Sequence, residues 1–185
     1  GSTYNTPLGA FSSATGDLRL LNVTAGVGGR SYMAFAKVPR ALQEFCQWLN
    51  NERQQVNTAD VLSVYRLSFL AHYRLVTIHP LADGNGRMAR LVMNMIQWEY
   101  NLIPVKVLKE QKAEYIQALI DTREQENENI FVDAMLRIHQ QNLSSEIAAF
   151  KASMVMDVLP NDTKDDTKQL TERQCFMLDL IRQDD

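Results

Sequence analysis

Apolar residues recur at intervals of three and four along most of the chain after Pro39, a spacing typical of amphipathic helices. The pattern predicts a first helix that begins at Pro39 and buries Leu42, Phe45 and Leu49. Further helices are predicted at about residues 58–76, 86–100, 109–122 and 129–157. In the second helix apolar residues cover most of the circumference, which predicts a central, largely buried element.

The ends and faces of these helices can also be predicted. Thr58 is the expected N-cap of the second helix, and Asn101 is the expected C-cap of the third. Cys46 lies beside the apolar stripe of the first helix, which predicts a buried thiol. The third helix carries an apolar stripe expected to face the core, formed by Met88, Leu91, Val92, Met95 and Ile96.

The two ends of the chain differ from this helical middle. Residues 1–31 are rich in Gly, Ser, Thr and Asn, which predicts loop with one short strand. Residues 27–35 predict a glycine turn between two short strands, either a functional flap or an ordinary surface hairpin. Residues 161–169 are polar and predict a linker. A capping box at residues 171–174 then opens a helix that ends with the chain, and this helix belongs either to the same domain or to a further one.

Composition narrows the class of protein. A chain of 185 residues with 45% hydrophobic content suits one domain with a packed core. The net charge of −3 gives no overall basic field for nucleic acid. Cys46 and Cys175 have no metal-type spacing, and no apolar run approaches the ~20 residues that span a bilayer. These features predict a cytoplasmic protein that binds no membrane.

The most informative segment is residues 77–90, where the third predicted helix begins. Gly84, Asn85 and Gly86 lie at its N-terminus, where unpaired N–H groups and the helix dipole attract an anion. Arg87 and Arg90 share a face of its first turns, although cations oppose the dipole there. A strongly negative ligand would offset that repulsion, so the sequence predicts a polyphosphate site.

Two further residues of this segment suggest chemistry. Asp83 would repel a phosphate unless a divalent cation lay between them, and Mg²⁺ uses one or two carboxylates together with phosphate oxygens. His79, followed by Pro80, could accept a proton from an incoming hydroxyl. Taken alone, a histidine such as His79 is usually a loop residue, and an aspartate such as Asp83 is usually a helix N-cap. Eight specified positions match by chance about once in 10¹⁰ starts, so together they predict phosphoryl or nucleotidyl transfer.

The segment resembles the signature of the Fic family, His-Pro-Phe-x-(Asp/Glu)-Gly-Asn-Gly-Arg-x-x-Arg. Leu81 stands where the family usually has phenylalanine, and a large apolar substitute should still pack inward. The resemblance extends over residues 16–140. It includes the segments at 38–50 and 71–76, and one at 109–115 in which the family has a tyrosine near the nucleotide base. Most characterised members transfer AMP from ATP to a hydroxyl side chain of a target protein.

The resemblance implies an all-α Fic core with a small β-hairpin flap, acting as a protein adenylyltransferase that uses ATP and Mg²⁺. His79 would be the general base and Asp83 the Mg²⁺ ligand. The expected nucleotide-binding residues are Gly84, Asn85, Gly86, Arg87, Arg90 (for the γ-phosphate), Tyr115, Gly28, Gly29 and Arg30. The Fic domain would span 1–159, with the flap at about 27–37 and the catalytic loop at 79–90. A linker at 160–169 and a truncated domain of the winged-helix kind at 170–185 would follow.

Several alternatives stay open. The donor could be another nucleotide or a phosphocholine conjugate, the enzyme could be a kinase, or the site could be a nucleotide sensor with a DNA-binding tail. A target protein would dock on the flap edge, and the oligomeric state is open, a homo-oligomer included. Many Fic enzymes are inhibited by a helix of pattern (Ser/Thr)-x-x-x-Glu-(Gly/Asn), which residues 122–127 match formally. We expect instead that an inhibitory helix is N-terminal or belongs to a separate protein.

Overall fold

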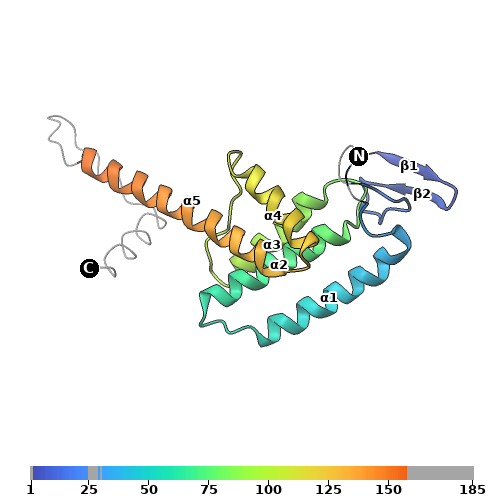
Figure 1. Cartoon of the computed structure of the whole chain (residues 1–185), viewed down its shortest axis with the longest axis horizontal. Helices are drawn as coiled ribbons and strands as arrows, with labels where there is room; N and C mark the ends of the chain where they lie inside the picture. Colours follow the sequence, from blue (N-terminus) through green and yellow to red (C-terminus); the bar gives the residue numbers. More distant parts are fainter. Residues whose placement is uncertain (1, 25–28, 30, 158–185) are drawn as a thin grey trace. The chain divides into compact units, whose positions relative to one another are not determined.

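The structure is a computed structural model that describes residues 2–24, 29 and 31–157. Its elements are the strands β1 (Thr3–Thr6) and β2 (Gly9–Ser12), the 3-10 helix η1 (Phe35–Lys37), and the helices α1 (Val38–Gln55), α2 (Val61–Ile78), α3 (Asn85–Glu99), α4 (Lys112–Glu124) and α5 (Glu128–Asp157) (Figure 1). The predicted helical fold class is therefore confirmed, and the helix positions agree closely with the predicted ones.

Residues 1–138 form one compact unit that contains every candidate site residue, and the chain from residue 139 belongs to a second unit. Several sequence predictions lie outside the described residues, namely the linker at 160–169, the segment 170–185, Cys175, Gly28 and Arg30. Among the described residues, no helix is both long and apolar enough to cross a lipid bilayer.

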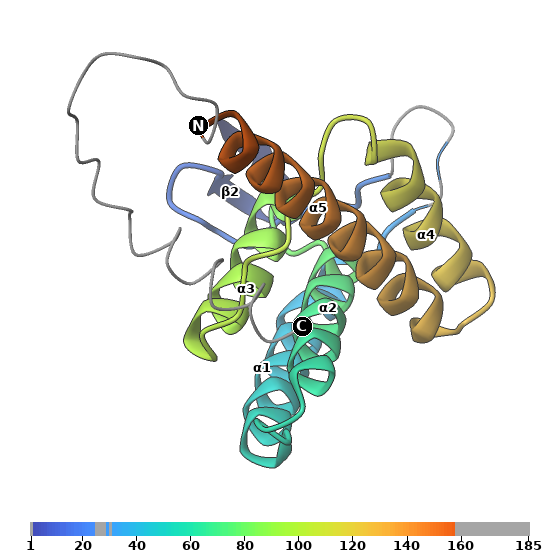
Figure 2. The same cartoon turned by 90° about the vertical axis from the view of Figure 1, so that its left-hand side faces the viewer.

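Helix α2 is the centre of the first unit. Ten of its side chains are buried, and α1 and α3 lie alongside it (Figure 2). Its buried side chains belong to two apolar clusters, one around Phe69 and Phe131 and the other around Val38 and Ile96. This confirms the prediction of a central buried helix. Because α2 is held on several sides, the turn that follows it starts from a fixed position.

The small sheet lies within residues 1–31, where the sequence predicted one short strand, and it has two strands. The antiparallel pair β1 and β2 lies at the start of the chain, with Tyr4 opposite Phe11. Among the described residues around the predicted flap, Thr24 and Ser31 form an isolated antiparallel bridge. The sequence did not predict two paired strands here, because each has only four residues and Phe11 is the only buried side chain in them.

Two predictions of burial are wrong. Cys46 is exposed, because it is one residue along the helix from the buried Phe45 and so points about 100° away from the core. On α3 the predicted stripe is right for Ile96, which is buried, and for Met88 and Val92, which pack against the core, but wrong for Leu91, 69% exposed, and Met95, 53% exposed; Ala89 and Met93 are buried as well. Both faces of α3 carry apolar residues, so the spacing alone could not show which face packs against α2.

The helix ends differ slightly from the prediction. Asp60 rather than Thr58 caps α2, with its carboxylate accepting the N–H of Leu62. Tyr100 is the C-cap of α3, and Asn101 follows it in the left-handed conformation with a φ of 57°. Asparagine is one of the few residues that adopt this conformation readily, so the sequence signal was right and its position was off by one.

Candidate functional site

The candidate site is the turn that joins α2 to α3. His79 ends α2 with a φ of 53° and a ψ of 59°, a left-handed conformation that costs a residue other than glycine about 1–2 kcal/mol. Gly84 begins α3 with a φ of 82°, where a side chain would add strain. These two left-handed residues reverse the chain, so the histidine and the N-terminus of α3 belong to one short loop.

Asn85 braces this loop from inside. Its side-chain Oδ1 accepts the N–H of Leu81 at 2.8 Å, and its Nδ2 donates to the carbonyl of Leu81 at 2.8 Å. The residue is only 2% exposed. Sequence analysis assigned Asn85 to the anion nest but did not predict that its side chain would hold the turn in shape.

Arg19 is a residue of the site that sequence analysis missed. It is 1% exposed, and its Nε donates to the carbonyl of His79 at 2.7 Å. Its other guanidinium nitrogens donate to the carbonyls of Leu21 and Met33, which belong to the segment before α1. Arg19 therefore joins the turn to the segment that carries the flap. The only available signal was an arginine within the apolar piece at residues 18–21.

His79 is enclosed by its surroundings. Its Nδ1 lies 3.2 Å from the carbonyl of Val76, and the Tyr32 ring stacks on the imidazole with centroids 3.7 Å apart. Burial has the largest effect and lowers the pKa of His79; the hydrogen bond with the Val76 carbonyl opposes it, and the positive charges of Arg19 and Arg123 lower the pKa by smaller amounts. The imidazole is therefore neutral at pH 7. If Nδ1 carries the proton bonded to Val76, Nε2 is left as the proton acceptor.

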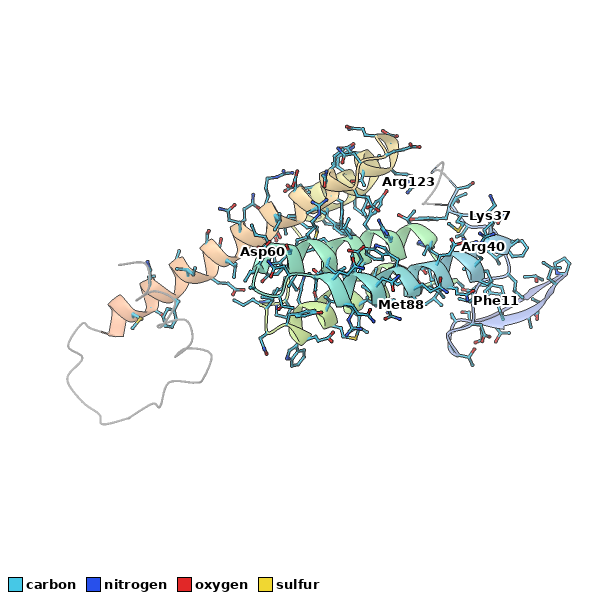
Figure 3. All side chains as sticks on the ribbon, turned by 90° about the horizontal axis from the view of Figure 1, so that it is seen from below. Phe11, Lys37, Arg40, Asp60, Met88 and Arg123 are labelled. Carbon is cyan, nitrogen blue, oxygen red and sulfur yellow. The ribbon has the colours of Figure 1, made fainter. Side chains whose placement is uncertain are left out.

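The Tyr32 ring also contacts a second residue, the cationic Arg123. The Arg123 guanidinium lies 5.5 Å from the centre of the Tyr32 ring, a cation–π distance. Arg123 comes from the C-terminal end of α4 (Figure 3). Because the Tyr32 ring contacts both Arg123 and His79, it links α4 to the turn. The backbone N–H of Tyr32 bonds to the carbonyl of Val23, next to the bridge that closes the flap. Of the predicted flap ligands only Gly29 is described.

The N-terminus of α3 gathers positive charge. Its first turn has no acidic residue. The Arg87 guanidinium lies 3.5 Å from where a Cβ on Gly84 would be, and that of Arg90 lies 3.6 Å from the same point on Gly86. Two positive groups thus lie over two glycines at the positive end of a helix dipole. Such an arrangement is stabilised by a bound anion.

Asp83 is the acidic group at this site. One carboxylate oxygen accepts the N–H of Gly84 at 2.6 Å, and the other lies 3.4 Å from Arg87. The side chain is 76% exposed. The described residues contain no group of three or more His, Cys, Asp or Glu that could hold a metal alone. A single accessible carboxylate beside an anion site fits Mg²⁺, which takes its remaining ligands from phosphate and water.

The structure places Tyr115 in the core cluster around Phe69 and Phe131. It is 5% exposed, and its hydroxyl lies 3.1 Å from Nε2 of the buried His72. Its proposed contact with a nucleotide base stays a prediction. Residues 122–127, which match the inhibitory pattern, straddle the end of α4. Glu126 lies beyond that helix with a φ of 51°, so this segment forms no separate helix.

Comparison with known families matches residues 4–97, just over half of the chain, to the Fic/DOC family. The chain is 37% identical over 89 residues to the protein adenylyltransferase Fic of Drosophila melanogaster, which covers 48% of this chain and 17% of that protein. It is 39% identical over 82 residues to the protein adenylyltransferase fic-1 of Caenorhabditis elegans, covering 44% and 15%. The chain therefore spans less than a fifth of these relatives.

Solved structures agree with this match. The structure of residues 134–508 of Fic-1 from C. elegans has a TM-score of 0.60 at 28% identity, covering 75% of this chain and 38% of that one. A Fic family protein from Desulfovibrio desulfuricans has a TM-score of 0.58 at 22% identity, covering 80% and 43%. At 22% identity, the similarity to the second structure shows only that the folds agree.

The stacking of Tyr32 on His79 leads to a prediction about the histidine. Tyr32→Ala should raise the pKa of His79 towards its ordinary value of about 6.5, because one face of the imidazole returns to water. Tyr32→Phe, which keeps the ring, should leave the pKa low. NMR titration of the imidazole measures both variants. A pKa that is equally low in the Ala variant would show that the ring does not desolvate His79.

Proposed function

The chain belongs to the Fic/DOC family, and we propose that it is a protein adenylyltransferase that transfers AMP from ATP to a Ser, Thr or Tyr hydroxyl of a target protein. The observation that carries the proposal is the pairing of a neutral, enclosed His79 with the arginine-covered N-terminus of α3 in one short loop. Nucleotidyl transfer needs a base and a polyphosphate site close to each other, and this loop carries a candidate for each.

In the proposed reaction the hydroxyl oxygen of the target attacks the α-phosphorus of ATP. The proton of that hydroxyl passes to Nε2 of His79 as the new oxygen–phosphorus bond forms. The bond between the α-phosphorus and the bridging oxygen breaks, and pyrophosphate leaves with the electron pair. AMP stays on the target. Because the pKa of His79 is lowered, the imidazole is already unprotonated at pH 7 and ready to accept this proton.

The remaining residues bind the triphosphate. The backbone N–H groups of Gly84, Asn85 and Gly86 would donate to phosphate oxygens, and Arg87 would bind them with its guanidinium. Arg90 would reach the γ-phosphate. Mg²⁺, held by Asp83, would neutralise part of the phosphate charge. Catalysis of this kind depends mainly on positioning and charge, which suits a loop held by Arg19 and Asn85.

The target would dock beside the flap. The Tyr32 ring covers one face of the His79 imidazole. An incoming hydroxyl therefore has to approach the imidazole from another side or displace the Tyr32 ring. Gly28, Gly29 and Arg30 are proposed to contact the nucleotide or the target from the flap tip. Cys46 is an exposed free thiol, which supports the proposal that the protein acts in a reducing compartment such as the cytoplasm.

The role of His79 has a direct test. His79→Ala should reduce transfer by about 10²–10⁴-fold, as loss of a general base typically does, while ATP binding stays largely intact. Mass spectrometry of the modified protein measures the first effect, and isothermal titration measures the second. His139→Ala, which alters a histidine outside the site, is a control. Undiminished modification by the His79 variant would overturn the assignment.

The role of Asp83 is tested by binding. Asp83→Asn should remove the increase in ATP affinity that Mg²⁺ produces, because the site offers a metal one carboxylate. Isothermal titration with Mg²⁺ and with a chelator compares the variant with the wild type. If the Mg²⁺ effect is the same in both, Asp83 serves only to bond the N–H of Gly84 and pair with Arg87.

A further inference from the structure

Helix α3 carries an apolar stripe on the side opposite its buried face. Leu91 and Met95 are more than half exposed, and Trp98, at 76%, is the most exposed large apolar side chain among the described residues. Spacings of four and three residues place all three on one side of the helix. Together they expose on the order of 400 Å² of mostly apolar surface, a size of patch that often marks an interaction site.

The two ends of this stripe carry opposite charges. Arg87 lies one turn before Leu91, and its side chain is largely exposed. Glu99 directly follows Trp98 and is partly exposed. The helix dipole adds positive charge at the first end and negative charge at the second. A helix that covers the stripe therefore fits best when it runs antiparallel to α3, with its negative end beside Arg87.

The stripe is also complementary to itself. When two copies of a helix pack antiparallel about a two-fold axis, each residue faces the one that lies equally far on the other side of the axis. With the axis level with Met93, charge meets opposite charge and apolar meets apolar in every pair, namely Arg87 with Glu99, Met88 with Trp98, and Leu91 with Met95. A second copy of this chain therefore satisfies the whole stripe in one register, twice over.

We propose that the chain forms a two-fold dimer in which the α3 helices of the two copies pack antiparallel through Leu91, Met95 and Trp98. With the residues that flank the stripe, the two copies would bury about 1,000 Å² in total, at the low end of specific interfaces. The dimer is therefore weak and depends on concentration. Arg87 and Glu99 each also pair with a charged residue of their own chain, so they fix the register more than they strengthen the dimer.

The apolar centre of the interface is tested by sedimentation equilibrium of the full chain up to about 1 mM. The wild type should pass from monomer to dimer as concentration rises. Leu91→Glu should stay monomeric, because it places a carboxylate against Met95 of the second copy. Leu62→Glu is the matched control, since Leu62 is 62% exposed on α2, outside the stripe, and this variant should dimerise like the wild type.

Two results of this measurement would overturn the proposal. A wild type that stays monomeric at about 1 mM would show that the stripe serves a partner other than a second copy. A Leu91→Glu variant that dimerises as tightly as the wild type would show that another surface forms the dimer. Neither result depends on the proposed function, because no ATP and no transfer step enter the measurement.

The antiparallel register has a separate test by charge reversal. Arg87→Glu sets two glutamates against each other and Glu99→Arg sets two arginines, so each variant alone should dimerise at least about 10-fold more weakly. An equimolar mixture should recover the affinity of the wild type, because both contacts of the mixed dimer then join a glutamate to an arginine. Recovery would also show that both variants are folded. A mixture that associates no better than either variant alone would overturn the proposal.

Discussion

The arrangement of the site depends on the buried guanidinium of Arg19. It donates to the carbonyls of His79, Leu21 and Met33, which lie on three separate stretches of chain. Hydrogen bonds to a charged group contribute about 1.5–3 kcal/mol each, and a buried charge left without partners costs several kcal/mol. The lowest-energy arrangement is therefore the one in which all three carbonyls stay in place. The position of His79 and the base of the flap are set together.

This anchoring explains how a strained residue can persist at the site. The left-handed conformation of His79 is unfavourable by itself, but the end of the buried helix α2, the Arg19 bond and the Asn85 brace leave the chain no better alternative. The same contacts fix where the imidazole lies relative to the N-terminus of α3. His79 and the N-terminus of α3 are thereby held at a constant separation, as the proposed transfer would require.

The electrostatics follow from this geometry. Arg87 and Arg90 lie over Gly84 and Gly86 at the positive end of α3, so the free protein carries unfavourable charge at that point. A polyphosphate would relieve it. The site is therefore preorganised before a ligand binds.

Local patterns in the sequence predicted the helices and the motif, because helix periodicity, caps and the residues of a short loop are all close together along the chain. Contacts between distant segments left no such pattern. Arg19 meets His79 across 60 residues, and the Tyr32 ring reaches the same histidine from the flap. The choice of the buried face of α3 and the exposure of Cys46 also depend on packing partners, which a single helix does not specify.

The central claim is that AMP is transferred to a protein hydroxyl. It is tested most directly by incubating the chain, alone and with a proteome extract, with ATP labelled at either the α-phosphate or the γ-phosphate. The account predicts that protein acquires label from the α-phosphate only, and that this label is absent with the His79→Ala variant. Incorporation of the γ-label without the α-label would contradict the account and identify a kinase.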